Sequence, residues 1–279
     1  MSTLDDRLEA LAAQFAGLPG VLVAFSGGVD SGVVLAAAVR ALGAGRVVAA
    51  TAVSPSLPSS ERALAAEFVG SLGVRHEQPR TDELSREGYR ANAGDRCAFC
   101  KSELVDVLTP LAARLGIADV VTGTNADDLR AGFRPGIRAA AERGAWAPLA
   151  RAGMTKDDVR AAAHLWGLPL ADKPAAACLA SRIAYGVPVS AEGLARVETA
   201  EAGLRAALDD AGLPVRNLRV RDLGGDTARV EIDASLVADL VARPELLDAV
   251  AGFAAVEVDP RGFRSGSMNE LLPDPVRYR

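Results

Sequence analysis

The length, composition and charge of this chain limit the classes of protein to which it can belong. Its 279 residues suffice for one large domain or two ordinary ones. A net charge of −5 argues against a general nucleic-acid-binding surface, which needs clustered Lys and Arg. No apolar run reaches the ~20 residues that cross a bilayer, and the N-terminal residues do not form a signal peptide. We therefore expect a cytoplasmic protein that binds neither nucleic acid nor membrane.

Histidine and cysteine are scarce. The two histidines, His76 and His164, offer little material for a histidine-rich metal site or a Ser/His/Asp triad. The apolar helical pattern around His164 predicts a packed side chain there. Three cysteines in a reducing compartment do not indicate a disulfide framework, so they need another explanation.

Strands and helices alternate along the first part of the chain. After a helix at 4–15, the apolar pattern predicts strands at 21–25, 47–53, 74–78 and 119–124 and helices at 33–42, 60–72 and 101–115. This alternation is typical of parallel βαβ units, in which ligands bind at the carboxyl ends of the strands. The predicted fold class is α/β, a doubly wound parallel sheet.

The pattern changes in the last third of the chain. A helix at 155–165 is followed by a boundary-like stretch at 168–174. A helix then reaches about residue 211, and alternating strands follow at 215–221, 228–232 and 254–258, the first two joined by the turn 224–226. We expect an ATP-binding domain over 1–170, a linker and active-site loop over 171–189, and a smaller α+β domain over 190–279 for substrate binding and oligomerisation.

A glycine-rich turn, Phe-Ser-Gly-Gly-Val-Asp-Ser at 25–31, connects the first of these strands to a helix. Its glycines permit close backbone approach, and the following helix offers unpaired N–H groups, so the turn can hold an anion. It lacks the Gly-Lys-Ser/Thr of a Walker A loop. Ser-Gly-Gly-x-Asp-Ser instead resembles the PP-loop of ATP pyrophosphatases, which split ATP between the α and β phosphates. The alternative is an ordinary glycine-rich β–α turn.

The cysteines fall into two groups. Cys97 and Cys100 form one CxxC, a weak signal that fits half a zinc site, a redox pair or chance. Cys178 lies in a small-residue loop near the expected domain boundary, with Arg182 four positions later. This arginine could stabilise a Cys178 thiolate and make it nucleophilic. The alternative for Cys178 is a buried small hydrophobe.

Four segments taken together resemble the LarE family of ATP-dependent sulfurtransferases, which make the nickel-pincer nucleotide cofactor. They are 26–31, Arg-Cys-Ala-Phe-Cys-Lys at 96–101, Gly-Thr-Asn-Ala-Asp-Asp at 123–128 and Cys-Leu-Ala-Ser-Arg-Ile at 178–183. The resemblance implies that ATP adenylates a carboxylate of pyridinium-3,5-biscarboxylic acid mononucleotide and releases pyrophosphate. It further implies a homo-oligomer, with a hexamer as the expected form.

The resemblance also implies two possible sources of sulfur. In single-cysteine members the cysteine attacks the acyl-adenylate, surrenders its sulfur and becomes dehydroalanine. Other members carry three cysteines that hold a [4Fe-4S] cluster with an extra sulfide at its open iron. Cys97, Cys100 and Cys178 are the three cysteines of this chain, which favours the cluster and leaves the sacrificial route open.

The remaining site residues are assigned from the motifs. For ATP we expect Ser26, Gly27, Gly28, Asp30, Ser31, Val53, Gly123, Thr124 and Asn125, and Lys101 resembles a family position near the phosphates. Asp30 and Asp128 are candidate Mg²⁺ ligands, although Asp30 could be only a helix cap.

The substrate carries a phosphate and two carboxylates, so its cleft should present arginines. We expect Ser181, Arg182, Arg219 and Arg221 there, and Arg229 could extend the group. The alternative for Arg219 and Arg221, which alternate along one strand, is an ordinary exposed strand face. Glu198, Glu201 and Glu231 are expected to be solvated acids.

Three other functions remain open. A tRNA-thiolating enzyme should carry a basic RNA-binding region, which the net charge disfavours. An amide synthetase would need an ammonia source, and no N-terminal cysteine glutaminase segment is present. A nucleotide-binding regulator without turnover would leave Cys178 and the CxxC unexplained.

Overall fold

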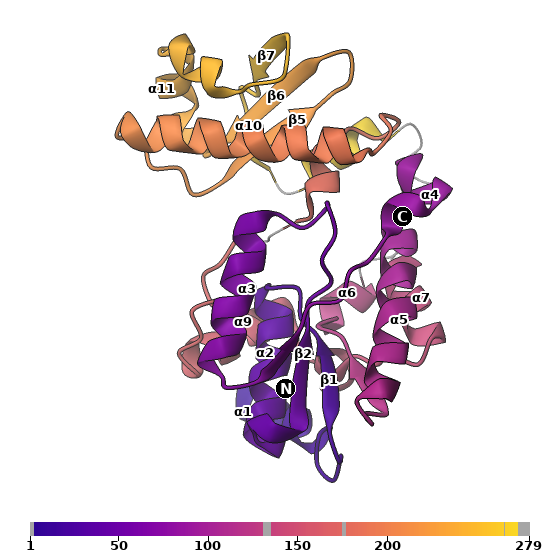
Figure 1. The fold of residues 1–279 in the computed structure, drawn as a ribbon. Coiled ribbons are helices and arrows are strands. Elements are labelled where there is room, and N and C mark those ends of the chain that lie inside the picture. Colours follow the sequence, from indigo (N-terminus) through magenta and orange to yellow (C-terminus); the bar gives the residue numbers. More distant parts are fainter. Residues whose placement is uncertain (1–2, 131–134, 175–176, 265, 273–279) are drawn as a thin grey trace. The chain divides into compact units, whose positions relative to one another are not determined.

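The computed structural model describes residues 3–130, 135–174, 177–264 and 266–272. The chain divides into two compact units (Figure 1). The first unit comprises Met1–Glu83 and Cys97–Ala176, and the second comprises Leu84–Arg96 and Ala177–Tyr278. None of the described helices is long and apolar enough to cross a membrane.

The first unit is built on a four-stranded parallel sheet of order β3-β2-β1-β4. The strands are β1 (Val21–Ala24), β2 (Val47–Ala50), β3 (Arg75–Glu77) and β4 (Asp119–Val121). β1 and β2 are continuous apolar runs because they are covered on both faces, as parallel strands usually are. The predicted α/β fold with a parallel sheet is confirmed.

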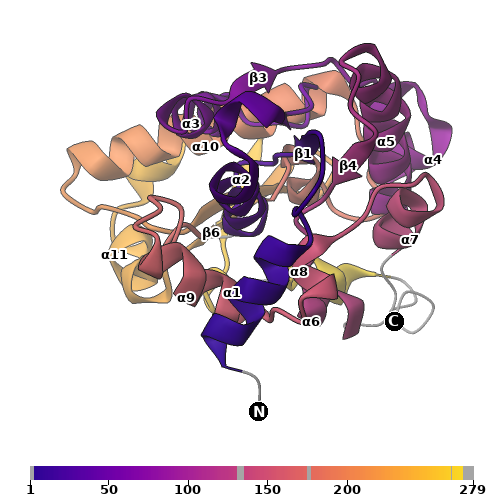
Figure 2. The ribbon, with the colours of Figure 1, turned by 90° about the horizontal axis from the view of Figure 1, so that it is seen from below.

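Helices cover both faces of this sheet, and β1 shows the division. Val21 and Val23 pack into one core with α1 (Leu4–Ala13), α2 (Val29–Leu42), α3 (Ser59–Ser71) and α9 (Lys156–Leu165). Leu22, between them, packs into a second core with α5 (Arg96–Arg114) and α7 (Pro135–Glu142). Figure 2 shows α2 and α5 on opposite sides of β1 and β4. The shorter helices of this unit are α6 (Ala126–Arg130) and α8 (Pro148–Arg151).

Local sequence signals account for the ends of several helices. Thr3 and Thr155 each form a capping box, with Asp6 and Asp158, at the start of α1 and α9. The predicted packing of His164 is wrong, because its side chain is 55% exposed and its Nε2 lies 3.4 Å from Asp172 Oδ1. The buried face of α9 is formed by Val159, Ala162 and Ala163, and residue 164 follows on the outer side.

The second unit contains a three-stranded sheet of order β5-β6-β7. β5 (Leu218–Asp222) pairs antiparallel with β6 (Thr227–Ile232), which pairs parallel with β7 (Ala255–Val258). One face is apolar and packs under α10 (Ala191–Asp210) through residues such as Val220, Val230 and Leu204. Because side chains alternate along a strand, Arg219, Arg221 and Glu231 share the opposite face. The unit also holds α4 (Glu87–Arg90) and α11 (Val237–Val241).

Candidate functional site

The glycine-rich turn connects the end of β1 to the start of α2, as predicted. Gly28 is the N-cap of α2, and Gly27 has a φ of 77°, a conformation that favours glycine. The Ser31 hydroxyl shapes the turn from inside, because it accepts from Ser26 N (3.2 Å) and donates to Gly28 O (3.1 Å). The first N–H groups of α2 therefore open at the carboxyl end of the sheet, an arrangement that can bind phosphate.

The loop that follows β4 packs directly on this turn. A β-carbon on Gly123 would lie only 2.6 Å from Ser31 N, so glycine is required for the close approach. Asn125 is buried and its Nδ2 donates to Asp30 Oδ1 at 3.0 Å. The structure thus brings the 26–31 and 123–125 segments together, as the shared strand edge predicted. Val53 lies beyond the end of β2 at the same edge, where its N–H donates to Pro79 O (2.9 Å).

Asp30 is already engaged by two neighbours. Asn125 donates to one carboxylate oxygen, and Lys156, the first residue of α9, forms an ion pair with the other. Asp128 forms reciprocal hydrogen bonds with Asn125 at the start of α6. These carboxylates suit Mg²⁺ as a ligand type, but an ion bound to Asp30 would compete with Lys156. The sequence analysis missed Lys156, whose one local signal was its position directly after the Thr155 cap.

The CxxC begins a helix instead of preceding one. We predicted a helix from residue 101, whereas α5 starts at Arg96 and carries Cys97 and Cys100 among its first five residues. Neither of these two cysteines forms a disulfide, and Cys97 is exposed. Gly136 of α7 packs against this turn, since a β-carbon there would lie 2.7 Å from Lys101 Cγ. In the described ranges no three His, Cys, Asp or Glu side chains gather in a group that could hold a metal ion.

Cys178 belongs to the second unit and directly precedes a short 3-10 helix, Leu179–Arg182. Its side chain is exposed, so the alternative of a buried small hydrophobe is wrong. Its carbonyl accepts from Ser181 N (2.9 Å), Ser181 Oγ (2.7 Å) and Arg182 Nη1 (3.2 Å). The backbone of the nucleophile candidate is therefore fixed while its thiol remains accessible.

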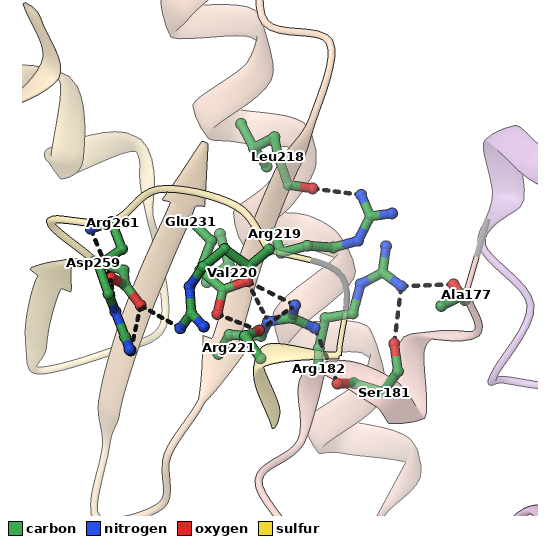
Figure 3. Close-up of polar contacts among 12 residues, drawn as sticks. Ala177, Ser181, Arg182, Leu218, Arg219, Val220, Arg221, Glu231, Asp259 and Arg261 are labelled. Carbon is green, nitrogen blue, oxygen red and sulfur yellow. Dashed lines mark hydrogen bonds and ion pairs between the residues drawn. The ribbon is translucent and has the colours of Figure 1, made fainter. Parts of the chain in front are cut away.

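Arg182 is buried and donates hydrogen bonds to the backbone around Cys178. Its Nη1 also donates to Ala177 O at 2.5 Å (Figure 3). Its Nε and Nη2 donate to Glu201 at 2.9 and 3.1 Å. Glu201 in addition accepts from Val220 N at 3.0 Å. The expectation that Glu201 is a solvated acid is wrong, because it pairs with a buried arginine and an edge-strand amide.

Arg221 and Glu231 form a second buried pair. Arg221 Nη2 lies 2.7 Å from Glu231 Oε2, and the two side chains are 6% and 1% exposed. Arg221 also donates to Ser181 O (3.1 Å), and Ser267 Oγ donates to Glu231 Oε1 (2.8 Å) (Figure 3). Glu231 was expected to be solvated, and that is also wrong. The pair connects the sheet to the loop that carries Cys178.

Arg219 lies among positive charges. Burial, together with the nearby Arg182 and Arg221, lowers its pKa to about 10, against the opposing effect of Glu201. The structure therefore gathers the three predicted arginines in the second unit. Arg229, expected to extend the group, is bound instead to Glu257 of β7, with Nε 2.6 Å from Oε1.

Two residues that the sequence analysis did not single out also hold the Cys178 loop. Asn92, fully buried with a φ of 53°, donates to the carbonyls of Ala184 and Val187 at 2.8 Å. Arg96 donates to Asn92 Oδ1 and to Ala180 O (2.8 Å). No local pattern predicts the contacts of Asn92 and Arg96 with the Cys178 loop, which join residues more than 80 positions apart.

Comparisons with known proteins agree with this architecture. Residues 4–185 match the asparagine synthase family. A pyridinium-3,5-bisthiocarboxylic acid mononucleotide synthase of Lactiplantibacillus plantarum is 33% identical over 275 residues, covering 98% of this chain and 97% of the relative. An uncharacterized protein of Synechocystis sp. is 42% identical over 274 residues, covering 96% and 99% of the two chains. The chain therefore belongs to the LarE family of PP-loop ATP pyrophosphatases.

Proposed function

We propose that this protein uses ATP to activate the carboxylates of pyridinium-3,5-biscarboxylic acid mononucleotide and replaces an oxygen of each with sulfur. The observation that carries the proposal is the exposed Cys178 thiol on a backbone fixed by Ser181 and Arg182. The full-length similarity to a synthase of the bisthiocarboxylic product supports the substrate.

In the activation step a substrate carboxylate oxygen attacks the α phosphate of ATP, and the bond to the β phosphate breaks. Negative charge then grows on the departing pyrophosphate, where fixed donors are most effective. We assign this role to the backbone N–H groups of Gly27, Gly28 and Ser31, with Lys101 as a further cation. Asp30 and Asp128 would hold Mg²⁺, which would neutralise phosphate charge when bound. The wider ATP site consists of Ser26, Val53, Gly123, Thr124 and Asn125.

We assign the anionic groups of the substrate to the arginines of the second unit. Arg219 is our first choice for direct contact, because Arg182 and Arg221 surround it with positive charge. Burial first, and then the positive neighbours, lower its pKa, and a bound phosphate or carboxylate would offset the repulsion between the arginines. Ser181 supplies a hydroxyl beside them.

We propose that the sulfur comes from a [4Fe-4S] cluster on Cys97, Cys100 and Cys178. Three thiolate ligands suit such a cluster, which would supply sulfide at the iron that lacks a protein ligand. Arg96, directly before Cys97, bonds to Ala180, two residues after Cys178, and this contact supports a shared role of the two segments.

The second candidate is sacrificial transfer. The Cys178 thiolate would attack the acyl-adenylate, forming a thioester and expelling AMP. Loss of the Cys178 α proton would then break its Cβ–S bond, leaving dehydroalanine and a thiocarboxylate. The exposure of Cys178 suits this route as well.

One experiment separates these candidates. Iron and acid-labile sulfide are measured on anaerobically reconstituted protein and on Cys97→Ala, and intact mass is measured after one turnover with ATP and the dicarboxylate. Iron near four per chain that is lost in the variant supports the cluster. Absence of iron, with a chain that has lost the elements of H₂S, supports sacrifice. Pyrophosphate is measured in the same turnover. If none is released, both sulfur-transfer routes are overturned and a nucleotide-binding regulator is favoured.

The remaining parts of the proposal concern assembly and location. We propose a homo-oligomer, with a hexamer as the form implied by the family resemblance, working in the cytoplasm, where ATP is available and free thiols persist. Light scattering on the purified chain measures the oligomeric state directly.

A further inference from the structure

Lys173 contacts the glycine-rich turn without belonging to it. Its Nζ donates to Gly27 O at 2.9 Å and to Glu61 Oε2, on α3, at 2.6 Å. The Lys173 and Glu61 side chains are 13% and 19% exposed, so both are largely removed from water. No role has been assigned above to this pair, although it touches the backbone that should meet the phosphates.

The segment that carries Lys173 is firmly anchored in the first unit. Leu170 packs against α2 where residue 32 is glycine, because a β-carbon on Gly32 would lie 2.6 Å from Leu170 Cδ1. Arg160 of α9 donates to Ala171 O at 2.6 Å. Lys173 therefore reaches Gly27 from a fixed backbone.

The hydrogen bond from Lys173 Nζ to Gly27 O favours one of two orientations of the peptide group between Gly27 and Gly28. In a trans peptide the C=O and N–H bonds point in opposite directions, so the direction of Gly27 O also fixes that of Gly28 N–H. A peptide group between two glycines can rotate at little steric cost. Such a rotation would point Gly27 C=O in the direction that Gly28 N–H had faced. A carbonyl facing a phosphate repels it, whereas an N–H binds it.

We propose that Lys173 is a positioning residue of the ATP site: it holds Gly27 O outward so that Gly28 N–H faces the phosphates. Glu61 balances the charge of Lys173, so the effect on ATP acts through the peptide orientation more than through an added positive charge. The inference rests on the proposed ATP site alone and not on the sulfur-transfer route.

The test compares the affinities of ATP and adenosine, measured calorimetrically with excess Mg²⁺, for the full chain and for Lys173→Met. Methionine keeps the apolar stem but lacks the ammonium group. ATP affinity should fall about tenfold, the scale of one charge-assisted hydrogen bond, while adenosine affinity stays unchanged. Equal weakening of both ligands would mean a merely structural role and would overturn the proposal, as would unchanged ATP affinity.

Two variants complete the design. Glu61→Gln keeps an acceptor for Lys173 but removes the balancing charge; it should change ATP affinity less than about threefold, whereas clear tightening would point to direct charge attraction and overturn the proposal. If Lys173→Met does not fold, Lys173→Gln is judged by the same ratio of ATP to adenosine affinity. A parent chain that binds ATP no better than adenosine would refute the phosphate site itself, and this failure is distinguishable from a failure of the Lys173 proposal.

Discussion

Replacement of Asn92 by alanine should destabilise the second unit substantially. The side chain is fully buried, and its Nδ2 donates to Ala184 O and Val187 O at 2.8 Å and to Ile183 O at 3.3 Å. Its Oδ1 accepts from Arg96. The bonds to Ala184 O, to Val187 O and from Arg96 each contribute about 1 kcal/mol net, and the longer contact with Ile183 O is not counted. Loss of these three bonds should therefore lower the free energy of unfolding by about 3 kcal/mol.

The backbone adds a smaller effect that can be separated. Asn92 has a φ of 53°, a left-handed conformation that costs an alanine about 1 kcal/mol and a glycine little. Asn92→Ala should therefore cost about 4 kcal/mol, and the matched variant Asn92→Gly about 3 kcal/mol.

Urea unfolding followed by two probes measures these changes. Both tryptophans, Trp146 and Trp166, lie in the first unit, so their fluorescence reports that unit alone, while circular dichroism reports the helices of both units. The loss of stability of the second unit should appear in the unfolding transition followed by circular dichroism. A free energy of unfolding within about 1 kcal/mol of the parent for Asn92→Ala would refute the reasoning about the hydrogen bonds. An Asn92→Gly variant no more stable than the alanine variant would refute the backbone argument.

Three further predictions concern buried or capping charges. Glu231→Gln leaves the Arg221 guanidinium without a balancing charge, so urea unfolding should show a loss of about 3–5 kcal/mol; a loss below about 1 kcal/mol would contradict a buried pair. Burial lowers the pKa of His76, so the folded state disfavours its protonation and loses stability as the pH falls below the ordinary value of 6.5. His76→Gln should lose less stability than the parent between about pH 7.5 and about pH 5.5, and parallel curves would count against this. Burial raises the pKa of Asp158, but hydrogen bonds, chiefly from Thr155, outweigh it and lower the pKa; Asp158→Asn should therefore cost about 1 kcal/mol at neutral pH and progressively less in acid, and a pH-independent cost would be inconsistent with this reasoning.

The geometry of the glycine-rich turn and of the loop that packs on it was largely predictable, because its signals are local. The 25–31 turn needs Gly27 for its backbone conformation, and the strands that precede the two loops, β1 and β4, are short and mainly apolar. Parallel strands end at a common edge, so the 26–31 and 123–125 loops had to meet. The roles assigned to the individual side chains there remain predictions.

The shared strand face of Arg219 and Arg221 was predicted, but the acidic partners of Arg182 and Arg221 were not. The alternation of Arg219 and Arg221 placed them on one strand face, as the register confirms. Sequence reasoning failed for Glu201 and Glu231, since an acid is usually solvated and the buried partner of each lies on a different element, 19 and 10 positions away. It also gave no sign that 84–96 belongs to the second unit.

The sequence alone determined the α/β class, the glycine-rich turn and the capped helices, because each depends on neighbours a few residues apart. Tertiary structure decided which charges are paired, which lysines reach Asp30 and Gly27, and how Asn92 and Arg96 hold the Cys178 loop. The contacts of these lysines, and those of Asn92 and Arg96 with the loop, join residues about 80 to 150 positions apart, and the packing of whole elements brings them within hydrogen-bonding distance. No local pattern of side chains encodes that proximity.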